Sequence, residues 1–222
     1  QAGTDIIYLG NDRISVFLTG VREFYMYSIS SGVFSPLSAY PTTITASGSG
    51  TWYDGNDTIY AYLGSWIWYN TGRSRPTMAM YSISTDTWKT LATAPISAVS
   101  VQNNLVSDGN GGLYIFTGNT VDNLSANQRA FRYDIAKDSW SEVRGVPVQT
   151  YNGSITSDSQ RYIYILPGGN GTNSRKMVRY DTWTKTFSPS TLGIDSLDRV
   201  PYDSQVNAYQ WIAGNATTAT YD

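Results

Sequence analysis

The chain of 222 residues contains no cysteine and no histidine. These absences exclude a Ser-His-Asp triad, a cysteine nucleophile and an ordinary zinc site, because each needs one of the two side chains. A pair of carboxylates could still hydrolyse a glycoside. However, Glu23 and Glu142 are the only glutamates, and most of the aspartates stand at repeated turn positions. We therefore expect a protein that is not an enzyme and binds no metal or other cofactor.

Charged residues are also scarce. Fifteen Lys and Arg stand against seventeen Asp and Glu, for a net charge of -2, and none of them forms a basic run. Nucleic-acid binding needs a basic face, so we expect no nucleic-acid partner. The chain has no apolar run of about 18 residues that could span a bilayer, and no charged-then-apolar signal segment. We therefore expect no membrane span.

Aromatic residues and glycine are abundant, with eighteen Tyr, seven Trp and twenty Gly. This composition favours strands and turns over helices. A Tyr is followed seven positions later by a bulky ring, with a turn-forming run between them, which predicts a β-hairpin. The hairpin recurs at a period of about 40–50 residues, which is typical of a propeller or array. Its four copies are Tyr27 to Phe34, Tyr81 to Trp88, Tyr133 to Trp140 and Tyr180 to Phe187.

An apolar strand ending at a glycine precedes each hairpin, as in Tyr60-Ala61-Tyr62-Leu63-Gly64, and an Asp/Asn/Gly turn precedes that strand. A further short strand lies upstream, so each unit predicts four antiparallel strands. The sequence therefore predicts one all-β domain over residues 1–222, with about five repeat units. The units span approximately residues 1–40, 41–95, 96–147, 148–195 and, in part, 196–222.

The last unit stops early, because Tyr221-Asp222 aligns with Tyr133-Asp134 and the closing aromatic strand is missing. Residues 1–9 align with the first strand of unit one and do not fill the gap. An unpaired strand edge invites strand addition. We therefore expect either further chain beyond Asp222 or a strand lent by a neighbouring subunit.

The Gly-ended strand followed by a Tyr and then a Trp or Phe resembles the kelch family of β-propellers over nearly the whole chain. The resemblance implies a ring of four-stranded blades. The copper oxidases of that family use His ligands and a Cys-linked Tyr, so their activity cannot be carried over to this sequence.

The repeated aromatics recur in every unit, so we expect them to form the core between blades. The aromatics that break the repeat are the better binding candidates. They stand in the variable loop after Gly64 beside two arginines, and could hold a sugar or a partner's loop by stacking and cation–π contact. The alternative is a loop folded onto its own blade. The candidates are Trp66, Trp68, Tyr69, Arg73 and Arg75.

These features predict a non-catalytic binding or structural propeller whose variable loops contact proteins or neighbouring subunits. We expect it on an exposed assembly such as a virion, a phage tail or an extracellular filament. The first alternative is a carbohydrate-binding or glycan-processing propeller. The second is an intracellular kelch adaptor.

Overall fold

The computed structural model describes most of the first 189 residues and two short pieces near the end of the chain. Within these ranges every helix or strand is a β-strand, so the all-β prediction is confirmed. The described ranges are residues 5–18, 22–41, 50–63, 77–95, 98–99, 105–116, 119–120, 123–126, 129–146, 154–166, 177–189, 202–203 and 208–209.

Four sheets of four antiparallel strands make up most of the described structure, and we call them blades one to four. Blade one contains β1 (Asp5–Gly10), β2 (Arg13–Leu18), β3 (Glu23–Ser28) and β4 (Phe34–Pro36). Blade two contains β5 (Gly50–Tyr53), β6 (Thr58–Leu63), β7 (Thr77–Ser82) and β8 (Thr87–Thr90). Blade three contains β10 (Val106–Ser107), β11 (Gly112–Phe116), β14 (Ala130–Asp134) and β15 (Ser139–Val143). Blade four contains β16 (Ser154–Ser157), β17 (Tyr162–Leu166), β18 (Val178–Asp181) and β19 (Thr186–Pro189).

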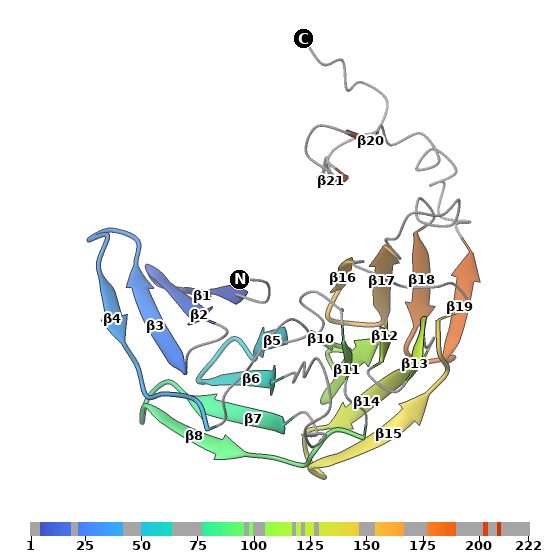
Figure 1. Cartoon of the computed structure of the whole chain (residues 1–222), viewed down its shortest axis with the longest axis horizontal. Helices are drawn as coiled ribbons and strands as arrows, with labels where there is room; N and C mark the ends of the chain where they lie inside the picture. The colour runs from blue at the N-terminus through green and yellow to red at the C-terminus, as the bar shows by residue number, and fades with distance from the viewer. Residues whose placement is uncertain are drawn as a thin grey trace.

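The blades stand side by side along an arc, with their first strands on the inner side and their fourth strands on the outer side (Figure 1). Along the inner side β1 contacts β5, β5 contacts β10, and β10 contacts β16. Each blade pairs its strands in chain order, so the predicted unit of four antiparallel strands is confirmed.

The core lies between the blades because side chains alternate across a strand and each sheet therefore has two faces to cover. We call the face toward the preceding blade the backward face and the face toward the next blade the forward face. Three apolar clusters fill the three boundaries. They are centred on Phe24 with Tyr81, on Tyr62 with Tyr133, and on Phe116 with Tyr180.

The number of units differs from the prediction, since the described residues form four blades and not about five. Of the predicted fifth unit, residues 196–222, the structure describes β20 (Tyr202–Asp203) and β21 (Ala208–Tyr209), which pair antiparallel. The rest of that unit lies outside the described residues.

A small additional sheet was not predicted. It orders β13 (Asn123–Ala126), β12 (Asn119–Thr120) and β9 (Ala98–Val99). Two of its strands come from the variable segment between β11 and β14, where the sequence predicted only a loop. The repeat pattern gave no signal for it because, among the described residues, this pairing occurs in one unit only.

Candidate functional site

The loop residues predicted to bind a ligand lie in residues 64–76, which are outside the described part of the chain. The binding role of Trp66, Trp68, Tyr69, Arg73 and Arg75 therefore stays a prediction.

The repeated aromatics pair across neighbouring strands. In each blade the Tyr of the third strand faces the ring of the fourth strand in register, as Tyr133 faces Trp140. The ring centroids lie 4.6 to 5.1 Å apart across the four blades. Three of the four Tyr side chains, Tyr81, Tyr133 and Tyr180, are buried between blades, and Trp88, Trp140 and Phe187 are half-buried.

Blade one departs from this pattern. Phe34 is 56% exposed and Tyr27 is only partly buried, because among the described residues no blade precedes blade one. The expected core role of these two aromatics is therefore not seen in the described structure. They lie instead on an open sheet face.

A polar contact that sequence reasoning missed joins each of two blades to the linker that precedes it. In blade three, Tyr133 donates its hydroxyl hydrogen to Oδ1 of Asp138 at 2.7 Å. The same Oδ1 accepts the backbone amide of Ala92 at 2.7 Å, and the indole of Trp140 donates to the carbonyl of Ala92 at 3.0 Å. We call this set of contacts the linker clamp.

Blade two repeats the linker clamp. Tyr81 and the amide of Ser38 donate to Oδ1 of Asp86 at 2.7 and 2.8 Å, and Trp88 donates to the carbonyl of Ser38 at 2.8 Å. The signal in the sequence is Tyr-x4-Asp-x-Trp, which occurs at Tyr81 and Tyr133. The aspartate lies in the turn-forming run between the two aromatics, so the repeat pattern predicts only a turn residue there.

The hydrogen bonds of the linker clamp lower the pKa of its aspartates and help to raise the pKa of its tyrosines. The amide of Ala92 and the hydroxyl of Tyr133 lower the pKa of Asp138, and the hydroxyl of Tyr81 and the amide of Ser38 lower the pKa of Asp86. Burial, reinforced by the bond to the carboxylate, raises the pKa of Tyr81 and of Tyr133. The clamp therefore holds a carboxylate in its ionised form beside a neutral phenol.

Blades one and four lack the clamp, because Gly32 and Lys185 stand where the aspartate would be and phenylalanine replaces the tryptophan. The buried hydroxyl of Tyr180 has no hydrogen-bond partner among the described residues. The two end blades of the arc thus differ chemically from the two middle blades.

A second set of contacts ties the two hairpins of a blade together at their turns. Asp57 in blade two accepts Ser82 Oγ at 2.7 Å and the amide of Ser84 at 2.7 Å. Asp12 does the same with Ser28 and Ser30 in blade one. These aspartates stand in the turn after the first strand, and the sequence pattern predicts only a turn there. It gives no sign of their hydrogen bonds to the second hairpin.

Blade four makes this tie with an ion pair. Arg161 stands at the position of Asp57 and binds Asp181 through three contacts of 2.6 to 3.1 Å. The bond to the Arg161 guanidinium holds the pKa of Asp181 well below its usual range. Arg161 also lies over an aromatic ring, with Cζ 4.6 Å from the ring centroid of Trp183, which is 67% exposed.

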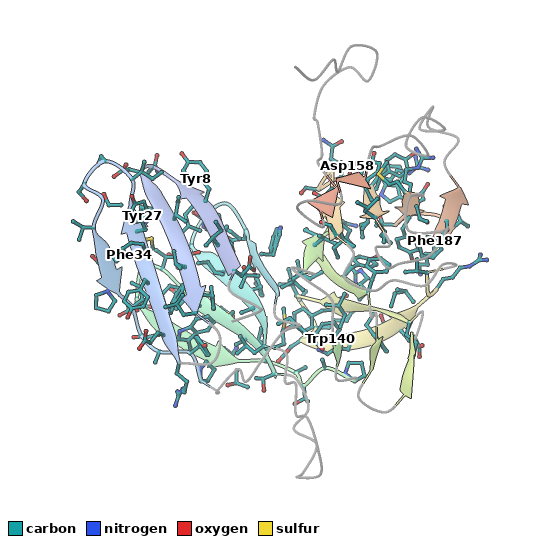
Figure 2. The ribbon with its side chains drawn as sticks, turned by 45° about the horizontal axis from the view of Figure 1, so that its top comes forward. Tyr8, Tyr27, Phe34, Trp140, Asp158 and Phe187 are labelled. Atoms are coloured by element: carbon teal, nitrogen blue, oxygen red, sulfur yellow. The ribbon has the colours of Figure 1, made fainter. Side chains whose placement is uncertain are left out.

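Blade one carries most of the exposed large apolar side chains among the described residues. Five of the six exposed large hydrophobic side chains belong to this blade or its last turn. Figure 2 shows Tyr8, Tyr27 and Phe34 on the blade at one end of the arc, with Asp158 and Phe187 on the blade at the other end. The five residues are Ile6, Tyr8, Ile29, Val33 and Phe34.

No group of three or more acidic side chains in the part of the chain that the structure describes is arranged to hold a metal ion. No helix in that part has the length and apolarity needed to cross a bilayer.

Four-stranded antiparallel sheets arranged side by side around their first strands define a β-propeller. Comparison with solved structures supports this class. A chain in the crystal structure of a nidogen/laminin complex is similar over 79% of this chain, with a TM-score of 0.56 and 13% identity. The match spans 57% of that chain, and at this identity the likeness shows the fold alone. No protein-family model matches the sequence, and neither does any curated protein.

Proposed function

We propose that this protein is a non-catalytic binding propeller that contacts a protein partner or a neighbouring subunit through the backward face of blade one. The observation that carries the proposal is the exposure of that face. Ile6 and Tyr8 are each 65% exposed and Phe34 is 56% exposed, on one side of one sheet. Exposed patches of this kind mark interaction sites on soluble proteins.

The repeat indicates what kind of surface would cover this face. In blades two and three the equivalent face packs against the forward face of the preceding sheet, with Tyr81 at 4.9 Å from Phe24 between ring centroids. Tyr27 occupies the position of Tyr81 in blade one. We therefore expect the partner to present an apolar β-sheet face, which packs well against an aligned sheet.

The absence of the linker clamp from blade one supports contact with a separate molecule at this face. With Gly32 in place of the clamp aspartate and Phe34 in place of the tryptophan, blade one cannot bind a linker backbone as Asp138 and Trp140 do. The contact then rests on apolar burial, in which aromatic side chains dominate.

The finer assignment is also a proposal. We infer a kelch-like propeller on an exposed assembly, either extracellular or part of a virion or phage tail. The Gly-ended strands with their Tyr and Trp or Phe hairpins support the kelch assignment, and the absence of cysteine and histidine with few charges suits an exposed module. The neighbour of known structure was solved as a complex of nidogen with laminin, which is a precedent for protein contact on this fold.

The two glutamates support the absence of catalysis. Glu142 is held by Arg129 through two hydrogen bonds of 2.8 Å, and Glu23 accepts the hydroxyl of Tyr25 at 3.0 Å. They stand on different blades and are both engaged by neighbours, unlike the paired carboxylates of a glycosidase. Turnover of a fluorogenic glycoside that is lost in Glu142→Gln would overturn this part of the proposal.

A photoactivatable phenylalanine analogue at position 34 tests the contact directly in the native assembly or cell that contains the protein. We expect one discrete cross-linked product from position 34, which disappears when Tyr8→Asp is added. The matched control carries the analogue at position 85, an exposed turn residue of blade two. If position 34 gives no product, or the same products as position 85, the proposal fails.

A further inference from the structure

We propose that blade four carries a binding site for an acidic sugar, formed by Arg161, Tyr162, Arg179 and Trp183, which we call the blade-four cluster. The site lies at the opposite end of the described arc from the open face of blade one, and it does not depend on the function proposed for that face.

Arg179 has an equivalent in blade three with a different environment. Arg132 stands at the same repeat position and donates to Asp108 at 3.1 Å and to Asp134 at 3.2 Å. The Arg132 guanidinium lies where a Cβ atom on Gly112 would clash with it, so glycine makes room for this ion pair. Blade three therefore neutralises its arginine internally.

In blade four a tyrosine replaces that glycine. Tyr162 stands at the position of Gly112, and Cζ of Arg179 lies 4.3 Å from its ring centroid. Oδ1 of Asp158, the equivalent of Asp108, accepts three turn amides, and no hydrogen bond or ion pair joins it to Arg179 within the described residues. The buried Nε of Arg179 has no partner among them.

The neighbouring acid does not compensate this charge, because it already has a partner. Asp181 is bound by Arg161 through Nε and Nη2, with the shortest contact at 2.6 Å. Among the described residues Arg179 therefore keeps a guanidinium without an ion-pair partner, lying on the ring of Tyr162. An arginine in this state is suited to a carboxylate, which its planar fork can bind through two parallel hydrogen bonds.

The aromatic part of the cluster adds a flat surface. Arg161 lies 4.6 Å from the ring centroid of Trp183 and 5.0 Å from that of Tyr162, so these side chains are held together. Trp183 is 67% exposed. The equivalent residues of blades one and two are Ser30 and Ser84, so the fold itself does not require an aromatic side chain at this position.

A ligand that uses both parts must carry a carboxylate next to an apolar ring face. A pyranose with a carboxylate, such as a sialic or uronic acid, has both features in one residue. An exposed indole can stack on its C–H face while Arg179 binds the acid. A phosphate-rich ligand such as nucleic acid fits less well, because it needs several uncompensated cations along a groove.

Calorimetric titration of the whole protein with 3′-sialyllactose and with a hyaluronan tetrasaccharide tests the site, with lactose as the neutral control. We expect saturable binding of at least one acidic probe, weaker at high salt, and none of lactose. Arg179→Met should weaken that binding about tenfold or more, and Trp183→Ser about fivefold. Arg129→Met, which removes an exposed arginine of blade three, should leave binding unchanged.

Both test substitutions use residues that the repeat already tolerates, since Met26 and Met80 stand at the position of Arg179 in blades one and two. Circular dichroism checks that each variant is folded. The proposal fails if neither acidic probe binds, if lactose binds equally well, or if Arg179→Met binds like the unaltered protein. It also fails if an acidic peptide displaces the sugar at equal concentration. None of these outcomes bears on the cross-link expected at position 34.

Discussion

The backbone amide of Ala92 donates a hydrogen bond to Oδ1 of Asp138 at 2.7 Å, across the boundary between blades two and three. The two residues are 46 positions apart in the sequence. Because Asp138 also accepts the hydroxyl of the buried Tyr133, one carboxylate oxygen fixes both the linker and the core aromatic. Packing alone would set the distance between two blades, and this contact also sets their register.

Removing the carboxylate should destabilise the propeller measurably. Asp138→Ala leaves the buried hydroxyl of Tyr133 and the amide of Ala92 without their acceptor, and it places alanine at a φ of 47°. We expect a loss of about 1–3 kcal/mol in the free energy of unfolding, measured in urea. Asp138→Asn keeps an acceptor and tolerates the left-handed backbone, so it should cost no more than about 1 kcal/mol. An Asp138→Ala variant as stable as the unaltered protein would show that the clamp contributes nothing to stability.

The clamp also predicts an acid dependence of stability. Asp138 and Asp86 have folded-state pKa values lowered from the ordinary 3.8 by the bonds they accept. A lowered folded-state pKa stabilises the protein above pH 3.8, and this contribution is lost as the pH falls through the folded-state values. The double variant Asp86→Asn and Asp138→Asn should therefore lose less stability than the unaltered protein between pH 6 and pH 2.5. Parallel urea midpoints for the two proteins over that range would contradict the assignment.

Much of the fold could be predicted because its signals are local and repeated. The turn at Asp54-Gly55-Asn56-Asp57 separates β5 from β6, and Gly55 has the positive φ of 84° that such a turn requires. The Tyr hairpins and the apolar strands before them could be predicted for the same reason, whereas the glycines expected to end those strands lie outside the described residues. Each of these signals depends on residues within one hairpin.

The parts that were missed depend on contacts between hairpins or blades. Nothing near Asp138 in the sequence indicates that its partner is Ala92. Arg132 and Arg179 stand at the same repeat position, yet Arg132 is ion-paired and Arg179 has no ion pair within the described residues. The difference follows the replacement of Gly112 by Tyr162 on the neighbouring strand. The exposure of Phe34 likewise depends on whether a blade precedes its own, which the repeat pattern alone does not determine.

Two members of the aromatic series, one in a middle blade and one in an end blade, should respond very differently to truncation. Trp140 is half-buried against the cluster between blades two and three and donates to Ala92, so Trp140→Ala should cost roughly 3–5 kcal/mol. Phe34 is largely exposed, so Phe34→Ala should change the stability of the isolated protein by about 0.5 kcal/mol or less. Thermal unfolding of both variants compares them directly. A large loss for Phe34→Ala would show that its face is already covered in the isolated chain.

The last prediction concerns two glycines at the same turn position of neighbouring blades. Gly55 and Gly109 both have positive φ, at 84° and 69°, so alanine at either position incurs the left-handed penalty of about 1–2 kcal/mol. Around Gly55 a Cβ atom would meet nothing within 4 Å, whereas at Gly109 it would overlap the backbone carbonyl of Ser159 in blade four. Backbone cannot move aside as a side chain can, so Gly109→Ala must separate blade three from blade four locally.

We expect Gly55→Ala to reduce the free energy of unfolding by the conformational penalty alone, and Gly109→Ala to reduce it by clearly more. Faster hydrogen exchange in β16 and β17 should accompany Gly109→Ala alone. Equal unfolding free energies for the two variants, with unchanged exchange in blade four, would mean that the turns of blades three and four do not touch at this point.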